Sequence, residues 1–178
     1  MTKKEMITKQ EASEQVSSMA RRAALIHYAF TKTLFDKLGK KKGTELARQA
    51  IKLYGEWVGK RVREKTLAKG LPLTRENFQD DLPALGWAER EIVEVEGEKR
   101  SRVFACPLAR VWQELGTPEL GRVYCFVDQS KYEAYNPELE CVHTKNVLDG
   151  DSYCELAVRR KNKNHRRQAH SRQRKISR

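Results

Sequence analysis

Residues 104–158 read FACPLARVWQELGTPELGRVYCFVDQSKYEAYNPELECVHTKNVLDGDSYCELAV. All four cysteines of the 178-residue chain fall in this stretch, at positions 106, 125, 141 and 154. The segments before it have the pattern of a helical scaffold with one strand pair, and the segment after it is a basic tail. We therefore expect any chemistry on a small molecule to take place between residues 104 and 158.

Helix and turn signals divide this stretch into two helices followed by two strands. Proline is favoured in the first helical turn, so Pro107 begins one helix that ends at Gly116. Thr117 and Pro118 begin a second helix, predicted to run to residue 135. A strand over 138–147 and a return strand over 153–160 follow, joined by an Asp-Gly pair at 149–150 that favours a hairpin turn.

A second strand pair is predicted upstream, because apolar and charged residues alternate over 87–96 and the chain returns over 102–105 after a turn. Two hairpins can join into one four-stranded antiparallel sheet with helices packed on one face. The fold class is therefore α+β. No glycine-rich phosphate loop follows a strand, which excludes a nucleotide-binding fold of that type.

The apolar pattern of the first 82 residues predicts helices. Apolar residues recur at spacings of three and four over 11–38, Gly39 ends that helix, and residues 40–43 form a turn. A second helix follows over 44–68, so an antiparallel helix pair is expected, with each apolar stripe facing the core. The stripes consist of Val16, Met19, Ala23, Ile26, Phe30, Leu34 and Leu38 in the first helix and Leu46, Ala50, Leu53, Trp57 and Arg61 in the second. Gly55 and Gly59 indicate either close approach to the first helix or clearance for a ligand, and Thr74 caps a short helix through Leu82.

Length and charge favour one α+β domain over residues 1–160, with a helical half at 11–82 and a sheet-and-helix half at 87–160. The formal net charge is +12, but residues 159–178 hold ten Lys and Arg and no acid, which leaves about +2 for the rest. Residues 161–178 are expected to be a disordered basic tail. The tail is either solubilising or a weak electrostatic contact for RNA or anionic lipid, and a nucleic-acid role for the domain is disfavoured.

The sequence has no run of 18 apolar residues and no signal peptide, so we expect a cytoplasmic protein without a membrane partner. Cysteines in that compartment are normally reduced. A small-molecule substrate is the expected partner, and a homo-oligomer is compatible with the sequence.

The cysteines allow three interpretations: small buried side chains, metal ligands or a reactive thiol. No CxxC pair occurs. Cys106 precedes a helix N-terminus, where free N–H groups favour a thiolate. Cys125 lies one helical turn before Asp128, which suits a nucleophile beside a proton carrier, or a pair of metal ligands. Cys154 is expected to lie on the apolar face of the last strand and to be buried in the core.

Asp128 is interpreted either as a buried carboxylate with a raised pKa, suited to general acid–base work, or as a solvated helix residue. His143 shares a strand face with Cys141. The two side chains are either metal ligands or strand residues, with His143 at the surface.

Several of these landmarks together are similar to a known family. They are Cys-Pro-Leu-Ala at 106–109, Trp112 with Glu-Leu-Gly at 114–116, Pro-Glu-Leu-Gly at 118–121, Tyr124-Cys125, Asp128, Asn136-Pro137, Leu148-x-Gly150-Asp151 and Cys154, with Arg21-Arg22-Ala23 and Tyr54-Gly55-x-x-x-Gly59 upstream. This pattern resembles the L-2-amino-thiazoline-4-carboxylic acid hydrolase family. The resemblance implies hydrolytic opening of a small cyclic C–N/C–S compound, in which water adds at the carbon between sulfur and nitrogen, the ring sulfur leaves and N-carbamoyl-cysteine is the product.

Such a reaction needs a nucleophile or an activated water, a proton carrier and a cation for the substrate carboxylate. Cys125 or Cys106 is the candidate nucleophile, and Asp128 is the candidate proton carrier. Arg22 or Arg122 is the candidate carboxylate anchor. Tyr124 and Tyr132 are further candidates for substrate binding.

Residues 150–156 are also similar to the end of ligand-binding domains of the vinyl-reductase type, some of which hold zinc through cysteines and a glutamate. That resemblance implies a non-catalytic small-molecule-binding or sensor domain as the alternative function. Zinc is then the candidate cofactor, with Cys125, Glu138, Cys141 and Cys154 as candidate ligands.

Overall fold

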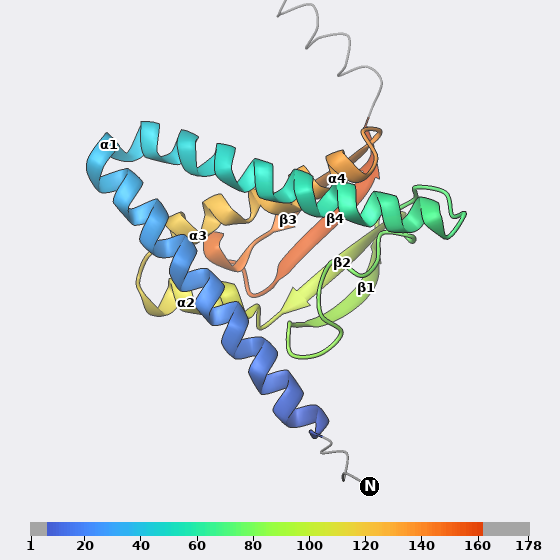
Figure 1. The fold of residues 1–178 in the computed structure, drawn as a ribbon, viewed down its shortest axis with the longest axis horizontal. Helices are drawn as coiled ribbons and strands as arrows, with labels where there is room; N and C mark the ends of the chain where they lie inside the picture. The colour runs from blue at the N-terminus through green and yellow to red at the C-terminus, as the bar shows by residue number, and fades with distance from the viewer. Residues whose placement is uncertain (1–6, 162–178) are drawn as a thin grey trace, which may run out of the picture.

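The computed structural model describes residues 7–161, and the basic tail beyond Lys161 lies outside these described residues. Helix α1 (Lys9–Ala68) begins at a capping box in which Thr8 and Glu11 bond each other's backbone N–H groups. The helix bends at Gly39, whose φ of 77° is outside the helical range and favours glycine. Two arms diverge from this residue (Figure 1). The predicted break at Gly39 is present, but the turn at 40–43 and the antiparallel helix pair are not confirmed, because one residue alone redirects the chain and residues 40–43 are helical.

The sheet has four antiparallel strands, which confirms the α+β class. The strands are β1 (Glu89–Val95), β2 (Glu98–Phe104), β3 (Leu139–Lys145) and β4 (Cys154–Arg160), in the spatial order β1-β2-β4-β3. Helix α4 (Phe126–Tyr135) packs on the sheet along β3, whereas α2 (Pro107–Glu114) and α3 (Pro118–Tyr124) lie beside one end of it. Helix α1 packs across all three of these helices (Figure 1). Trp112 anchors α2 to α1 by donating its indole N–H to the Ala24 carbonyl at 3.3 Å.

Small residues form the face of α1 that packs on the rest of the molecule, including Ala20, Ala24, Ala47, Gly55 and Gly59. A Cβ built on Gly59 would lie 2.1 Å from the Lys131 carbonyl oxygen, and one on Gly55 would lie 2.6 Å from the Ser130 Cβ. The two glycines therefore allow close approach of α1 to α4. The sequence predicted close approach, but to the first helix, with room for a ligand as the alternative.

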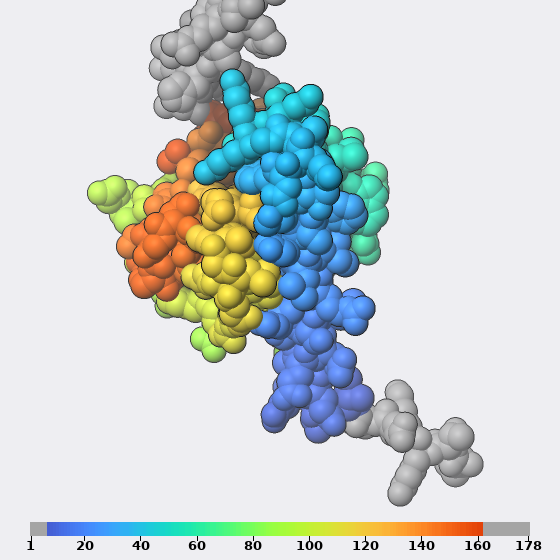
Figure 2. All heavy atoms as spheres, turned by 90° about the vertical axis from the view of Figure 1, so that its left-hand side faces the viewer, coloured from blue at the N-terminus to red at the C-terminus, as the bar shows by residue number. Residues whose placement is uncertain are grey.

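The predicted apolar stripes of α1 are largely not buried. Most of their large side chains are exposed: Met19, Ile26, Phe30, Leu38, Leu46, Leu53 and Trp57. The core prediction for these residues was wrong, because close contact with α2, α3 and α4 selects the small residues on the other side of each arm. Figure 2 shows α1, in blue to cyan, as an outer ridge of the molecule beside the yellow atoms of the α2–α3 region.

Two other predicted helices differ in the structure. The helix expected over 117–135 is divided at Cys125 into α3 and α4. Residues 74–82 form turns and bends, because tertiary contacts outweigh local helix signals there. Tyr135 donates to the Thr74 carbonyl at 3.0 Å, and Phe78 is inserted in the core.

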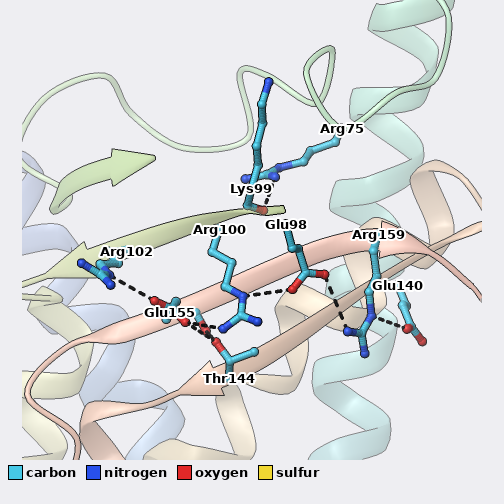
Figure 3. A network of polar contacts seen from close by, with 9 residues as sticks. All are labelled: Arg75, Glu98, Lys99, Arg100, Arg102, Glu140, Thr144, Glu155 and Arg159. Atoms are coloured by element: carbon cyan, nitrogen blue, oxygen red, sulfur yellow. Dashed lines mark hydrogen bonds and ion pairs between the residues drawn. The ribbon is translucent and has the colours of Figure 1, made fainter. Parts of the chain in front are cut away.

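The sheet face opposite the helices carries a charged network (Figure 3). Its centre is Glu155, whose side chain is almost fully buried and accepts hydrogen bonds at about 3.0 Å from Arg100, Arg102 and Thr144. Burial alone would raise the pKa of Glu155, but these donors outweigh it and lower the pKa to about 2. Side chains alternate along a strand, so the neighbours Cys154 and Leu156 point to the opposite face, toward the helices.

None of the helices formed by residues 7–161 combines the length and the apolar composition that a membrane crossing needs.

Candidate functional site

A cavity of about 180 Å³ lies between the helix-covered face of the sheet and α1, α2 and α4. Its lining includes the thiols of Cys106, Cys125 and Cys154, the charged or polar side chains of Arg90, Asp128, Lys131, His143 and Asn146, and the rings of Tyr54, Trp87, Trp112, Tyr124 and Tyr132. An apolar cavity of roughly 150 Å³ holds benzene. The cavity therefore suits one small ring with a few polar substituents.

A buried ion-pair chain crosses one wall of the cavity. The Lys131 ammonium lies 2.7 Å from Asp81 and 2.9 Å from Asp128. Burial alone would lower the pKa of Lys131, but the two carboxylates outweigh it and raise the pKa above its usual value. Burial alone would likewise raise the pKa of Asp128, but Lys131 and His143 hold it well below its usual range. The expected rise in the Asp128 pKa was wrong: this side chain is an anion at neutral pH.

His143 extends the ion-pair chain of Asp81, Lys131 and Asp128. Asn146 accepts the Leu148 backbone N–H on its side-chain oxygen, so its amide nitrogen faces His143 Nδ1 at 3.0 Å and donates to it. His143 Nε2 then carries the proton and donates to Asp128 at 3.0 Å. A β-bulge between residues 143 and 145 offsets the strand register at this point. Bulges re-aim side chains near functional sites, and here His143 lines the cavity.

The thiols facing the cavity have different surroundings. Burial raises the pKa of Cys125 to about 12, and a hydrogen bond from Asn146 only partly opposes this rise. Burial also raises the pKa of Cys106, and the charge of Asp128 adds to this rise, whereas the backbone N–H groups of Ala109 and Leu108 and the charge of Arg90 favour its thiolate. Cys106, at the start of α2, is therefore the thiol with the most direct support for a negative charge.

Two arginines line the cavity: Arg75, which donates to the Lys99 carbonyl, and Arg90. Arg90 is exposed and is the candidate cation for a substrate that enters from outside. It also lines an open surface groove of about 780 Å³, which shares Phe78, Asp81, Leu82 and Trp87 with the cavity lining. The two predicted carboxylate anchors lie elsewhere. Arg22 is exposed on α1 and lines neither space, and Arg122 pairs with Asp149 at 2.8 Å outside the cavity.

Aromatic rings also line the cavity. Tyr124 packs against Trp112 with ring centroids 5.5 Å apart and against Tyr54 at 6.4 Å. Tyr124 and Tyr132 both line the cavity, where burial raises their pKa values. His27 lies behind them, edge-on to Tyr124, and burial lowers its pKa to about 4, so it is neutral.

The structure does not bring the candidate zinc ligands together. Within residues 7–161, no three His, Cys, Asp or Glu side chains are arranged to hold a metal ion. Cys125 and Cys154 line the cavity, whereas Cys141 faces a separate surface depression and Glu138 is exposed. All four cysteines are free thiols.

Sequence reasoning missed Arg90, Lys131 and Asn146 at this site. One signal was available for Lys131, because it follows Asp128 by three residues, which places both on one side of α4. Arg90 carried no such signal among the alternating charges of β1, and Asn146 looked like an ordinary turn residue.

Fold and site together define an α+β protein with a small internal cavity lined by thiols and ion-paired side chains. The fold is similar to that of trafficking protein particle complex subunit 3 from Naegleria fowleri, a structure with covalently bound palmitic acid. That similarity has a TM-score of 0.50 and 14% identity and covers 80% of this chain and 95% of that one. The model of the L-2-amino-thiazoline-4-carboxylic acid hydrolase family matches residues 18–158, so the chain belongs to this family. No curated protein matches the chain.

Proposed function

We propose that this protein hydrolyses a small cyclic amidine-like compound, such as 2-amino-thiazoline-4-carboxylate, to N-carbamoyl-cysteine. One observation carries the proposal: a cavity the size of one small ring contains an anion at Asp128, a cation at Arg90 and the Cys106 thiol. All three residues line this one cavity. Family membership supports the choice of reaction.

The charges fit the two ends of such a substrate. The ring amidine is cationic when protonated and pairs with the Asp128 carboxylate. The substrate carboxylate pairs with Arg90, whose planar guanidinium can bind both of its oxygens. Tyr124 and Tyr132 contact the faces of the ring. Arg90 takes the role that the sequence analysis gave to Arg22 or Arg122.

Cys106 is the proposed nucleophile. Its sulfur attacks the ring carbon between sulfur and nitrogen, and the bond from that carbon to the ring sulfur breaks. The proton from the Cys106 thiol passes to the leaving ring sulfur. Asp128, whose pKa is held well below its usual range, binds the ring amidine as an anion in place of the proton-carrier role expected from the sequence. Water then adds to the same carbon, the bond to Cys106 breaks, and the carbamoyl product leaves with a new free thiol.

The test is an assay of N-carbamoyl-cysteine by mass spectrometry with purified protein and the thiazoline carboxylate. We expect turnover by the wild type, a loss of at least about 100-fold in Cys106→Ala, and less than about 10-fold in Cys125→Ala. Arg122→Gln is the control variant, because it removes a positive charge that lies outside the cavity, and it should keep the wild-type activity. No product above the buffer rate would reject this substrate, and full activity of Cys106→Ala would reject the nucleophile.

A second candidate function is non-catalytic binding of a small ring, as in domains of the vinyl-reductase type. The observation that favours it is the raised pKa of the cavity thiols, which keeps them protonated and less reactive. Saturable binding of the thiazoline carboxylate in calorimetry without any product would support this alternative over hydrolysis.

A further inference from the structure

The connection between α1 and β1 forms a wall that two spaces share. One space is the cavity of about 180 Å³, and the other is the open surface groove of about 780 Å³. Four side chains of this connection line both spaces: Phe78, Asp81, Leu82 and Trp87. A small molecule in the groove is therefore separated from the cavity by this stretch of chain.

The two ends of the wall are anchored, whereas its middle has few polar contacts. Phe78 is 8% exposed in the core, and Trp87 packs against the core cluster that contains Trp112. Between these anchors, residues 81–86 form no backbone–backbone hydrogen bond with any part of residues 7–161. A segment with few backbone hydrogen bonds opens locally more easily than a helix or a central strand.

The backbone changes direction at both ends of this middle part. Asp80 has a φ of 62° and Gly86 has a φ of 72°, both in the left-handed region. Gly86 also lies tightly against α1, because a Cβ built on it would collide with the Ser13 carbonyl. A loop that moves does so at a few terminal residues, which absorb the change in φ and ψ. Movement is therefore confined to the residues between Asp80 and Gly86.

One buried ion pair ties this part of the connection to α4. The Asp81 carboxylate lies 2.7 Å from the Lys131 ammonium, and the two side chains are 11% and 9% exposed. The neighbouring pair of Asp80 with Lys69 is 3.3 Å long, and both of its side chains are more than half exposed. Exposed pairs contribute little, whereas breaking a buried pair is costly. The Asp81–Lys131 pair is therefore the contact that holds the segment closed.

We propose that residues 80–86 are a lid between the groove and the cavity and that the Asp81–Lys131 ion pair is its latch. When the latch breaks, the lid moves away from α4 and a small molecule passes from the groove into the cavity. Lys131 also pairs with Asp128, so the latch adjoins the carboxylate that binds the ring amidine in the proposed function. The role of the lid in substrate entry rests on that function, whereas the lid itself is tested without substrate.

Alkylation of the full chain with iodoacetamide, followed by peptide mass spectrometry, measures opening of the lid. Cys154 is the reporter, because it is 7% exposed and lines the cavity but neither the groove nor the depression beside β3. Cys141 is the internal reference, because it is 4% exposed and lines only that depression. Asp81→Asn should raise the labelling rate of Cys154 at least about 5-fold and change that of Cys141 less than about 2-fold.

Asp80→Asn is the matched control, because it removes an exposed carboxylate from the same segment and asparagine tolerates the positive φ of this position. It should change the labelling of Cys154 less than about 2-fold. A smaller rise than about 5-fold at Cys154 in Asp81→Asn would overturn the proposal.

An equal rise at Cys154 and Cys141 would show that Asp81→Asn destabilises the whole fold. Leu82→Ala then decides, since it removes a lid side chain from the cavity wall and keeps the ion pair. This variant should raise the labelling of Cys154 alone. Equal labelling changes at both thiols in Leu82→Ala as well would overturn the proposal, because access to the cavity would then require general unfolding.

Discussion

Replacing Lys131 with methionine removes the one cation that pairs with both Asp81 and Asp128. Methionine keeps most of the buried stem, so the change isolates the charge. The Lys131 side chain is 9% exposed, and those of Asp81 and Asp128 are 11% and 21% exposed. Removal of one partner from a buried ion pair costs about 3–5 kcal/mol, because the remaining charge stays buried without compensation. We expect Lys131→Met to lose a free energy of unfolding in this range at pH 7.5.

The pH dependence of this loss has a definite sign. In the wild type, the pKa of Asp128 is held below its unfolded value, so its stabilising contribution is complete above that value and is lost only in acid. In Lys131→Met, only His143 still opposes the effect of burial, so the pKa of Asp128 rises from its wild-type position. Acid then removes less stability from the variant than from the wild type, and the cost of the substitution shrinks as the pH falls through the unfolded pKa of Asp128.

Urea unfolding followed by tryptophan fluorescence measures both effects. With a slope of about 2 kcal/mol per M urea, the midpoint should fall by about 1.5–2.5 M at pH 7.5 and by less at about pH 3, below the unfolded pKa of Asp128. Lys52→Met is the matched control, since Lys52 forms an exposed pair with Glu56 at 3.6 Å and should cost at most about 1 kcal/mol. A loss below about 1 kcal/mol for Lys131→Met at both pH values would refute this account of the ion-pair chain.

Three further predictions concern packing, charge and thiol reactivity. Gly59→Ala should cost about 1–3 kcal/mol in thermal unfolding, because its methyl group would meet the Lys131 carbonyl; an unchanged Tm would contradict this close approach. Glu155→Gln should cost roughly 2–3 kcal/mol at pH 7. That cost should shrink as the pH falls from 4.5 to about 2, the interval between the unfolded and folded pKa values. Iodoacetamide should label Cys106 faster than Cys125 in the folded protein at pH 7.5, as peptide mass spectrometry would show, and equal rates would argue against the different thiol surroundings.

Local signals predicted much of the sheet half of the fold. Pro107 and Pro118 each have a preferred place in the first helical turn, and α2 and α3 begin at these residues. The hairpin turn expected at the Asp-Gly pair is not confirmed, because a 3-10 turn over Val147–Asp149 that ends at Gly150 lies within a longer connection between β3 and β4. The order of the four strands follows from such signals only in part. The pairing of β2 with β4 depends on contacts between residues about fifty positions apart, which local patterns do not encode.

The helical half shows why apolar periodicity alone misleads. The stripe that includes Phe30 and Trp57 was expected to face the core, but small residues such as Gly59 face α4 instead. Periodicity identifies a face that needs a partner, and it does not say whether the partner belongs to the same chain.

At the site, sequence reasoning selected Cys106, Cys125 and Asp128, and all three line one cavity. The predicted direction of the Asp128 pKa shift was wrong. The burial of this carboxylate can be inferred from the apolar residues around it in the helix. Its pairing with Lys131 and His143 decides the pKa, and the His143 contact forms only when α4 and β3 pack together.

The most direct test of the proposed active site is kcat/KM for ring opening of 2-amino-thiazoline-4-carboxylate by wild type and Asp128→Asn, measured side by side. Asparagine keeps the shape of the side chain and removes the anion that pairs with the ring amidine. We expect kcat/KM to fall by about 10²–10³-fold in a variant that remains folded. A folded Asp128→Asn variant with the wild-type kcat/KM would show that the chemistry does not take place in this cavity.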